Sequence, residues 1–252
     1  RLIERGVAYE AEGDVYYEMA RRALEAADAA DDAIAAPGVR TAGTLRVQTN
    51  LTFAKHQLVP VLSEFLERNP RVRIEFLLTP EPLDMLEHRL DVAIRLGRQR
   101  DSSLVARRIA TTRRVICASP AYIAAHGLPR KPADLQKHNC LNFTRESPAY
   151  VPWMVSERKR VHEVSVTGPV DANQGEMLLA LAVAGVGIVR LAEFHVAESL
   201  RTGALVRVLP GFQDETVDPI YALYSSRRNL SARVRAFIDF LEAKFRRAAW
   251  AE

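Results

Sequence analysis

The sequence predicts an α/β fold, because strand-like and helical segments alternate along its first third. Three strand-like segments, 44–49, 72–78 and 91–96, are separated by a helical segment at 53–66 and a shorter one at 83–90. Alternation of strands with helices of this length predicts parallel strands joined by right-handed crossovers. In such a sheet the loops at the carboxyl ends of the strands gather at one edge, where small ligands bind.

The first strand and helix have the clearest signals. Segment 44–49 alternates apolar and polar residues, as a strand with one buried face does. The helix that follows places apolar residues at helical spacing, namely Phe53, Val59, Leu62, Phe65 and Leu66. It should end at Asn69, because the residue before a proline is pushed out of the α region.

The rest of the chain continues the alternation. We expect strands at 104–110, 114–118, 140–143, 188–191, 205–209 and 219–224, and a hairpin formed by 153–156 and 161–166. We expect helices at 120–125, 132–135, 176–184, 193–200 and 231–247. Glycines mark several helix ends, as in the Gly185-Val186-Gly187 stretch after the helix at 176–184.

A long helix is expected at 12–36, ended by Pro37 and Gly38. It is rich in Ala, Glu and Arg, which favour helices. Residues at alternating spacings of four and three form a heptad seam: Tyr16, Ala20, Ala23, Ala27, Ala30 and Ile34. A narrow alanine stripe favours a dimer-forming helix over one packed on its own domain.

Composition restricts the classes of protein. The 252 residues suffice for one large domain or two small ones, with 48% hydrophobic and 26% charged residues as in soluble globular proteins. A net charge of +4 permits a nucleic-acid partner but does not argue for one. The longest apolar run, 177–189, is too short to span a bilayer, and no secretory signal is present. We expect a cytoplasmic fragment without membrane contact, whose true start lies upstream.

Motifs of catalysis and metal binding are missing from the sequence. It has no G-x-S-x-G, P-loop, H-E-x-x-H or complete G-x-G-x-x-G, and its six histidines stand singly. Cys117 and Cys140 lie in apolar strand-like runs, where a buried role is favoured over a redox pair. The sequence therefore predicts no enzyme, no metal site and no cofactor.

Binding loops are the better candidates. Asn50 and Thr52 begin the first helix, where free N–H groups and side chains can receive an anion or simply cap the helix. Asn173 and Gln174 stand in the same relation to the helix at 176–184. Arg95, near the end of the third strand, could contact a ligand carboxylate or form an ion pair with a neighbouring residue.

Several strings together resemble one family. They are GTLRV at 43–47, NPRVRIE at 69–75, DVAIR at 91–95, CASPAY at 117–122 and AVAGVGI at 182–188. In combination they resemble the effector-binding domain of LysR-type transcriptional regulators, and the resemblance spans essentially the whole chain. YEAEG at 9–13 is similar to the end of the family's winged helix-turn-helix, with Glu10 in place of the usual threonine.

The resemblance implies an architecture. Two subdomains of the periplasmic-binding-protein type 2 kind should flank an effector cleft, preceded by a long linker helix. The implied division is a winged helix-turn-helix remnant at 1–11, the linker helix at 12–36, a hinge at 37–42, subdomain I at 43–114 and 219–248, and subdomain II at 115–218.

The resemblance also implies a function and its residues. A small metabolite, with an anion as one candidate, should bind between the subdomains and control transcription. Promoter DNA would be bound through the missing N-terminal domain of a homo-oligomer, either a dimer or a tetramer or larger. The implied effector contacts are Asn50, Leu51, Thr52, Thr79, Arg95, Leu96, Gly97, Phe143, Thr144, Asn173 and Gln174.

Two alternatives stay open on the sequence alone. A solute-binding protein for transport of a small anionic ligand could share the fold, but should carry an export signal and no heptad helix. A dimerisation scaffold without a ligand is the other alternative. The identity of the effector and the sign of regulation do not follow from the sequence.

Overall fold

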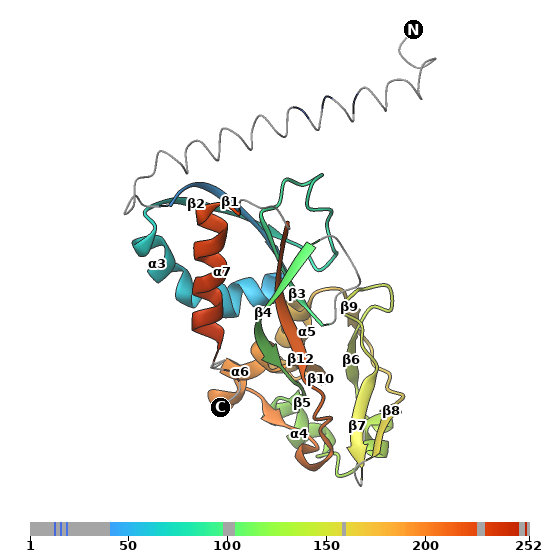
Figure 1. Cartoon of the computed structure of the whole chain (residues 1–252). Helices are drawn as coiled ribbons and strands as arrows, with labels where there is room; N and C mark the ends of the chain where they lie inside the picture. The colour runs from blue at the N-terminus through green and yellow to red at the C-terminus, as the bar shows by residue number, and fades with distance from the viewer. Residues whose placement is uncertain are drawn as a thin grey trace.

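The computed structural model describes Gly13, Tyr16, Met19 and residues 41–97, 104–157, 160–225, 230–246 and 250. Two five-stranded sheets and a two-stranded ribbon form the strand framework of these residues (Figure 1). The strand order is β2-β1-β3-β12-β4 in the first sheet and β11-β5-β10-β6-β9 in the second. The predicted α/β class is therefore confirmed.

The first sheet is mixed. Its strands are β1 (Ala42–Thr49), β2 (Arg71–Leu78), β3 (Val92–Leu96), β4 (Leu104–Thr112) and β12 (Asp218–Ser225). β1 runs parallel to β2 and β3, which confirms the pairing predicted from the alternation. β12 comes from late in the chain and runs antiparallel to β3 and β4.

The connection from β1 to β2 is a continuous helical run. It consists of α2 (Leu51–Phe53), a π-helical segment η1 (Ala54–Leu58) and α3 (Val59–Arg68). This run contains the predicted helix at 53–66, and it ends at Asn69 before the proline.

The predicted helix at 83–90 was wrong. These residues form turns, although Met85 and Leu90 are buried as an amphipathic pattern requires. The Asp84 carboxylate accepts hydrogen bonds from the N–H groups of Leu86 and Glu87 at 2.8 and 2.9 Å. These are the bonds of a helix N-cap, so Asp84 starts a single helical turn. Arg89 then has a φ of 51°, which ends any helical path.

The second sheet contains β5 (Arg114–Ala118), β6 (Cys140–Phe143), β9 (Asp171–Ala172), β10 (Ile188–Ala192) and β11 (Val206–Arg207). The predicted hairpin is confirmed as β7 (Trp153–Glu157) paired with β8 (Arg160–Val164). The strand predicted at 205–209 is shorter, because only Val206 and Arg207 pair with β5.

Helices cover both sheets. They are α4 (Pro120–His126), α5 (Gly175–Val183), α6 (Glu193–Arg201) and α7 (Ala232–Phe245), with short 3₁₀ segments η2 (Pro132–Lys137) and η3 (Pro210–Phe212). Helices α3 and α7 lie side by side on the first sheet, where the Phe65 ring contacts Phe237 and Phe240 with centroids 5.2 and 5.3 Å apart (Figure 1). Among the residues described, no helix is long and apolar enough to span a bilayer.

The expected N-terminal helix falls almost entirely outside the described residues. Gly13, Tyr16 and Met19 have helical backbone, and the Tyr16 and Met19 side chains are exposed. Of the seam residues, Ala20, Ala23, Ala27, Ala30 and Ile34 lie outside the described residues, as do segment 1–11 and most of 37–42.

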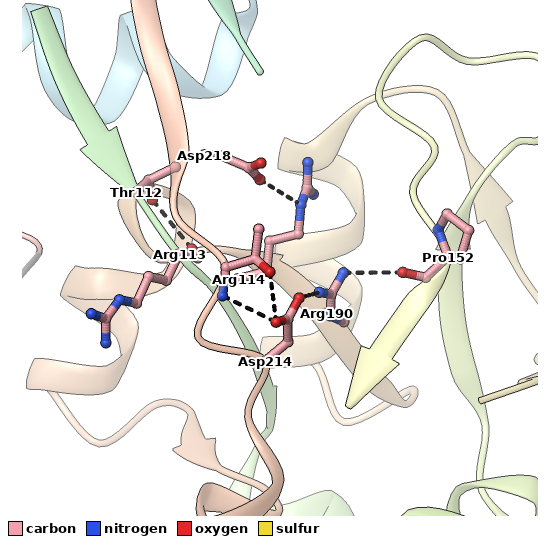
Figure 2. Close-up of polar contacts among 8 residues, drawn as sticks. Thr112, Arg113, Arg114, Pro152, Arg190, Asp214 and Asp218 are labelled. Atoms are coloured by element: carbon pink, nitrogen blue, oxygen red, sulfur yellow. Dashed lines mark hydrogen bonds and ion pairs between the residues drawn. The ribbon is translucent and has the colours of Figure 1, made fainter. Parts of the chain in front are cut away.

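The chain passes from the first sheet to the second between Thr112 and Arg114, and it returns just before β12. Two ion pairs hold these crossings together (Figure 2). Arg114 donates to Asp218 at 3.1 Å, and Arg190 lies 3.6 Å from Asp214. Arg190 also donates to the Pro152 carbonyl at 3.2 Å.

Arg190 and Asp214 form a buried pair, with side chains only 5% and 7% exposed. Burial and the neighbouring Arg114 lower the pKa of Arg190 to about 10, against the opposing attraction of Asp214. Arg190 is still a cation near neutral pH, so it needs its carboxylate partner. Each partner of such a pair depends on the other, since an uncompensated charge in the interior is costly.

We expect Asp214→Ala to lower the free energy of unfolding by about 3–5 kcal/mol, because it leaves Arg190 buried without its carboxylate. Glu198→Ala is the matched control: its pair with Arg201 is exposed, so the loss should be much smaller. Urea denaturation at neutral pH measures both. Equal, small losses for the two variants would contradict the expectation.

Candidate functional site

Four of the predicted contact residues lie at the carboxyl ends of β1 and β2. Asn50 is the N-cap of α2, and its Oδ1 accepts from the Phe53 N–H at 2.8 Å. Thr52 is buried, whereas Leu51 is partly exposed. The Thr79 N–H donates to the Thr49 carbonyl at 3.1 Å, which keeps Thr79 beside the end of β1.

Two buried polar residues of the same strand end were missed by sequence reasoning. The Gln48 amide donates to the carbonyls of Thr79 and Glu81, both at 3.1 Å. Among the described residues, Gln48 Oε1 and Thr49 Oγ1 are buried without a hydrogen-bond partner. The sequence did carry a signal, because a glutamine and a threonine end an apolar strand. Buried polar atoms normally have hydrogen-bond partners.

Arg95, Leu96 and Gly97 lie at the end of β3. The Arg95 guanidinium donates to the Leu83 carbonyl at 3.0 Å and forms no ion pair within the described part of the chain. Burial lowers the pKa of Arg95 below its ordinary value. Gly97 has a φ of 84°, which favours glycine, and its N–H donates to the Pro219 carbonyl at 2.8 Å. These contacts keep the three residues on the first sheet.

The remaining predicted residues surround the start of α5. Phe143 ends β6, and the Thr144 N–H donates to the Ala172 carbonyl at 3.0 Å. Asn173 precedes Gln174, the N-cap residue, whose side chain makes no capping bond. The Phe143 ring edge would lie 3.3 Å from a Cβ placed on Gly175.

A polar junction between η1 and the start of α5 connects the two sheets. The predicted residues at the start of α2 lie on one side of this junction, and those around the start of α5 lie on the other. Lys55 and His56 of η1 both bind the Glu176 carboxylate in the first turn of α5, with His56 Nε2 at 2.9 Å. Nearby, the Gln57 amide donates to the Phe194 carbonyl at 2.9 Å. Helix α2 packs against α5 and α6 beside this junction.

Glu176 is held as an anion. Burial alone would raise its pKa, but the hydrogen bonds and charges of Lys55 and His56 together lower the pKa below the ordinary 4.5. Sequence reasoning missed this cluster because its members are separated by 120 residues. A single histidine beside a lysine gives no signal of such a distant partner.

His195 fills the space beneath the start of α5. Its ring stacks on Phe194 at a centroid distance of 4.3 Å, and Nδ1 is buried without a partner among the described residues. A Cβ on Gly175 would lie 2.5 Å from His195 Nε2, so only glycine fits there. Burial, with smaller effects of Arg114 and His56, lowers the pKa of His195 to about 3. The imidazole is therefore neutral.

Two cavities lie elsewhere. One of about 460 Å³ lies between α3 and α7, and one of about 210 Å³ lies between β6 and the β7–β8 ribbon. Phe143 alone of the predicted contact residues lines the smaller cavity.

The cysteines are buried, as the sequence predicted. Cys117 and Cys140 are free thiols, and burial raises the pKa of each to about 12. A thiol with such a pKa is unreactive near neutral pH. No group of three or more His, Cys, Asp or Glu side chains suited to a metal ion occurs within the residues that the structure describes.

Comparisons with known proteins agree on one family. Residues 39–246 match the family model described as the LysR substrate binding domain. The chain is 30% identical over 241 residues to the HTH-type transcriptional regulator DmlR of Escherichia coli (strain K12), covering 96% of this chain and 78% of that protein. It is 32% identical over 230 residues to the HTH-type transcriptional regulator CrgA of Neisseria meningitidis serogroup C, covering 91% and 76%.

Solved structures lead to the same family. The regulatory domain of CrgA from Neisseria meningitidis superposes with a TM-score of 0.76 at 31% identity, covering 81% of this chain and 99% of that one. The virulence activator AphB of Vibrio cholerae, at full length, gives a TM-score of 0.71 at 26% identity and covers 93% and 79%. Nothing in these matches supports a transport protein. The chain therefore belongs to the LysR-type transcriptional regulators and contains their effector-binding domain, of the periplasmic-binding-protein type 2 fold.

Proposed function

We propose that a small effector binds between the two sheets, next to the junction of η1 with α5. The supporting observation is that two groups of residues from distant parts of the sequence flank this junction. Asn50 to Thr52 begin α2 on one side, and Phe143, Thr144, Asn173 and Gln174 surround the start of α5 on the other. Thr79 lies beside the end of β1, and Arg95 to Gly97 extend the same edge at the end of β3.

An acidic effector fits this place best. A helix N-terminus carries partial positive charge and N–H groups that favour anions. The side chain of Gln174 leaves the start of α5 uncapped, and Lys55 and His56 face it from η1. A carboxylate-bearing metabolite would compete with the Glu176 carboxylate for Lys55 and His56.

The two sheets support a division into two subdomains. We propose the boundaries expected from the sequence, 43–114 with 219–248 and 115–218, because the chain crosses between the sheets close to these positions. An effector that binds between the two subdomains shifts the balance between their arrangements only if it binds one arrangement more tightly than another. Regulation in this protein would then be a coupling between effector binding and subdomain arrangement.

The regulatory output would reach DNA through an N-terminal head. We propose that residues 1–11 end this head and that 12–36 form a linker helix, which pairs two chains in a dimer, a tetramer or a larger assembly. The relatives' description as HTH-type regulators supports DNA binding, for which a helix enters the major groove. Such a protein would work in the cytoplasm and without catalysis.

The effector site can be tested by substitution. We expect Asn50→Ala, Thr52→Ala and Asn173→Ala each to weaken effector binding about 5- to 30-fold, because each removes a polar group worth about 1–2 kcal/mol. Thermal-shift screening against metabolites identifies the effector, and calorimetric titration measures its affinity. Gln136→Ala, at an exposed position of η2, serves as the control. Unchanged affinity in all three variants would reject the site.

The junction should depend on pH through Glu176. Because its pKa in the folded chain lies below 4.5, its ionised contact stabilises the fold above that pH and is lost as pH falls through the lowered pKa. We expect Glu176→Gln to cost about 1 kcal/mol at neutral pH and less under acidic conditions. Urea denaturation at a series of pH values measures the difference.

The matched control for this pH series is Glu193→Gln. Glu193 stands in the first turn of the neighbouring helix α6 and pairs with Arg207 at 3.4 Å, within the second sheet. A pH-independent cost of Glu176→Gln, or the same pH profile for both variants, would contradict the assigned role of Glu176.

A further inference from the structure

Phe194 belongs to one sheet's helices but packs in the core of the other sheet. It belongs to α6, beside the second sheet, yet its ring is 1% exposed in the hydrophobic cluster of the first sheet. The ring meets Phe53 edge-on at a centroid distance of 5.4 Å. The Gln57 amide binds its backbone carbonyl at 2.9 Å, so both the ring and the main chain are held by the helical run after β1.

Trp250 completes the group of aromatic rings around Phe194. This group, Phe53, Phe245 and Trp250, is called the socket below. It is 4% exposed and lies with centroids 6.2 Å from Phe194, 6.3 Å from Phe53 and 5.5 Å from Phe245. Its indole Nε1 donates to the Thr111 carbonyl at 3.1 Å.

The position of this hydrogen bond matters. Thr111 directly precedes Thr112–Arg114, where the chain crosses to the second sheet, and the Arg114–Asp218 pair lies at the same crossing (Figure 2). Trp250 thus contacts three parts of the molecule: the Phe194 ring in α6, Phe245 at the end of α7, and β4, the strand that leads into the crossing. Each edge-to-face aromatic pair adds about 0.5–1.5 kcal/mol beyond burial.

Phe194 is also coupled to the effector site by its neighbour in sequence. His195 stacks on the Phe194 ring and lies against Gly175, the first residue of α5. A change in the position of the α5 N-terminus therefore acts on the same helical turn that carries the Phe194 ring. Packed interiors respond to such changes by switching between discrete arrangements.

We propose that Phe194 is the pivot between the two sheets and that Trp250 is a positioning residue that fixes their relative angle. This inference rests on the proposed function in one respect only, namely that the pivot transmits effector binding. The geometry itself is tested without an effector, so its failure and the failure of the effector site can be told apart.

The experiment measures a distance between the sheets in the full chain. Spin labels on cysteines introduced at Glu67 in α3 and Lys137 in η2, both exposed, report the arrangement by double electron–electron resonance. The native cysteines stay unlabelled, because both are buried thiols with a pKa of about 12. We expect one narrow distance distribution for the parent chain, and a broader and shifted one for Trp250→Ala.

Two further variants separate positioning from general stability. Trp250→Phe keeps a ring in the socket, against Phe194, but loses the hydrogen bond to Thr111, so it should give a distribution between those of the parent chain and Trp250→Ala. Phe240→Leu removes a ring from the first-sheet core, where Phe240 packs on Phe65, and should leave the distribution unchanged. If Trp250→Ala does not fold, Phe194→Leu takes its place under the same criterion.

Either of two outcomes would overturn the proposal. A narrow, unshifted distribution in a folded Trp250→Ala or Phe194→Leu chain would overturn it. An equal broadening in Phe240→Leu would also overturn it, since the effect would then follow from lost core packing of any kind.

Discussion

The structure depends on a chain that passes between two sheets twice, in opposite directions and side by side. A double crossing of this kind leaves each sheet with its own core while limiting how the two can move. Arg114 with Asp218 and Arg190 with Asp214 tie the crossings to each other and to β10. Charges buried this deeply contribute little net stability compared with apolar packing, but they penalise any arrangement that separates them. They therefore define geometry more than they add to stability.

The candidate site follows from that geometry. The η1 segment and α5 meet between the sheets, and each sheet contributes the start of one helix. Asn50 and Gln174 occupy the N-cap positions of these two helices, although only Asn50 caps with its side chain. The neutral, buried His195 packs against Gly175, and the ionised Glu176 next to it binds Lys55 and His56. Neither sheet alone presents this set of groups.

Much of the fold could be predicted from residue patterns. The period-two alternation of β1 and the proline after Asn69 predicted the first strand and helix, because both signals are local. The amphipathic pattern at 83–90 gave a single turn and not a helix: Asp84 caps the turn, but the left-handed conformation of Arg89 ends it at once. The return of β12 to the first sheet followed from the family resemblance, not from any local pattern.

The site was predicted less completely, for a physical reason. Helix starts are visible in a sequence, so Asn50 and Gln174 could be named as candidates. The pairing of His56 with Glu176, and of Phe194 with Trp250, depends on how distant segments dock, which no local period encodes. Gly175 is similar: its need to be glycine comes from His195, twenty positions further on, and not from its own backbone.

The π-helical segment Ala54–Leu58 has a consequence of its own. Hydrogen bonds from each residue to the fifth along, in place of the fourth, accommodate one more residue per turn than the α-helix on either side. Lys55 and His56 both lie in this wide turn, and both reach the Glu176 carboxylate of the other sheet. Deleting one residue here, so that the turn became α-helical, would rotate the two side chains away from that carboxylate.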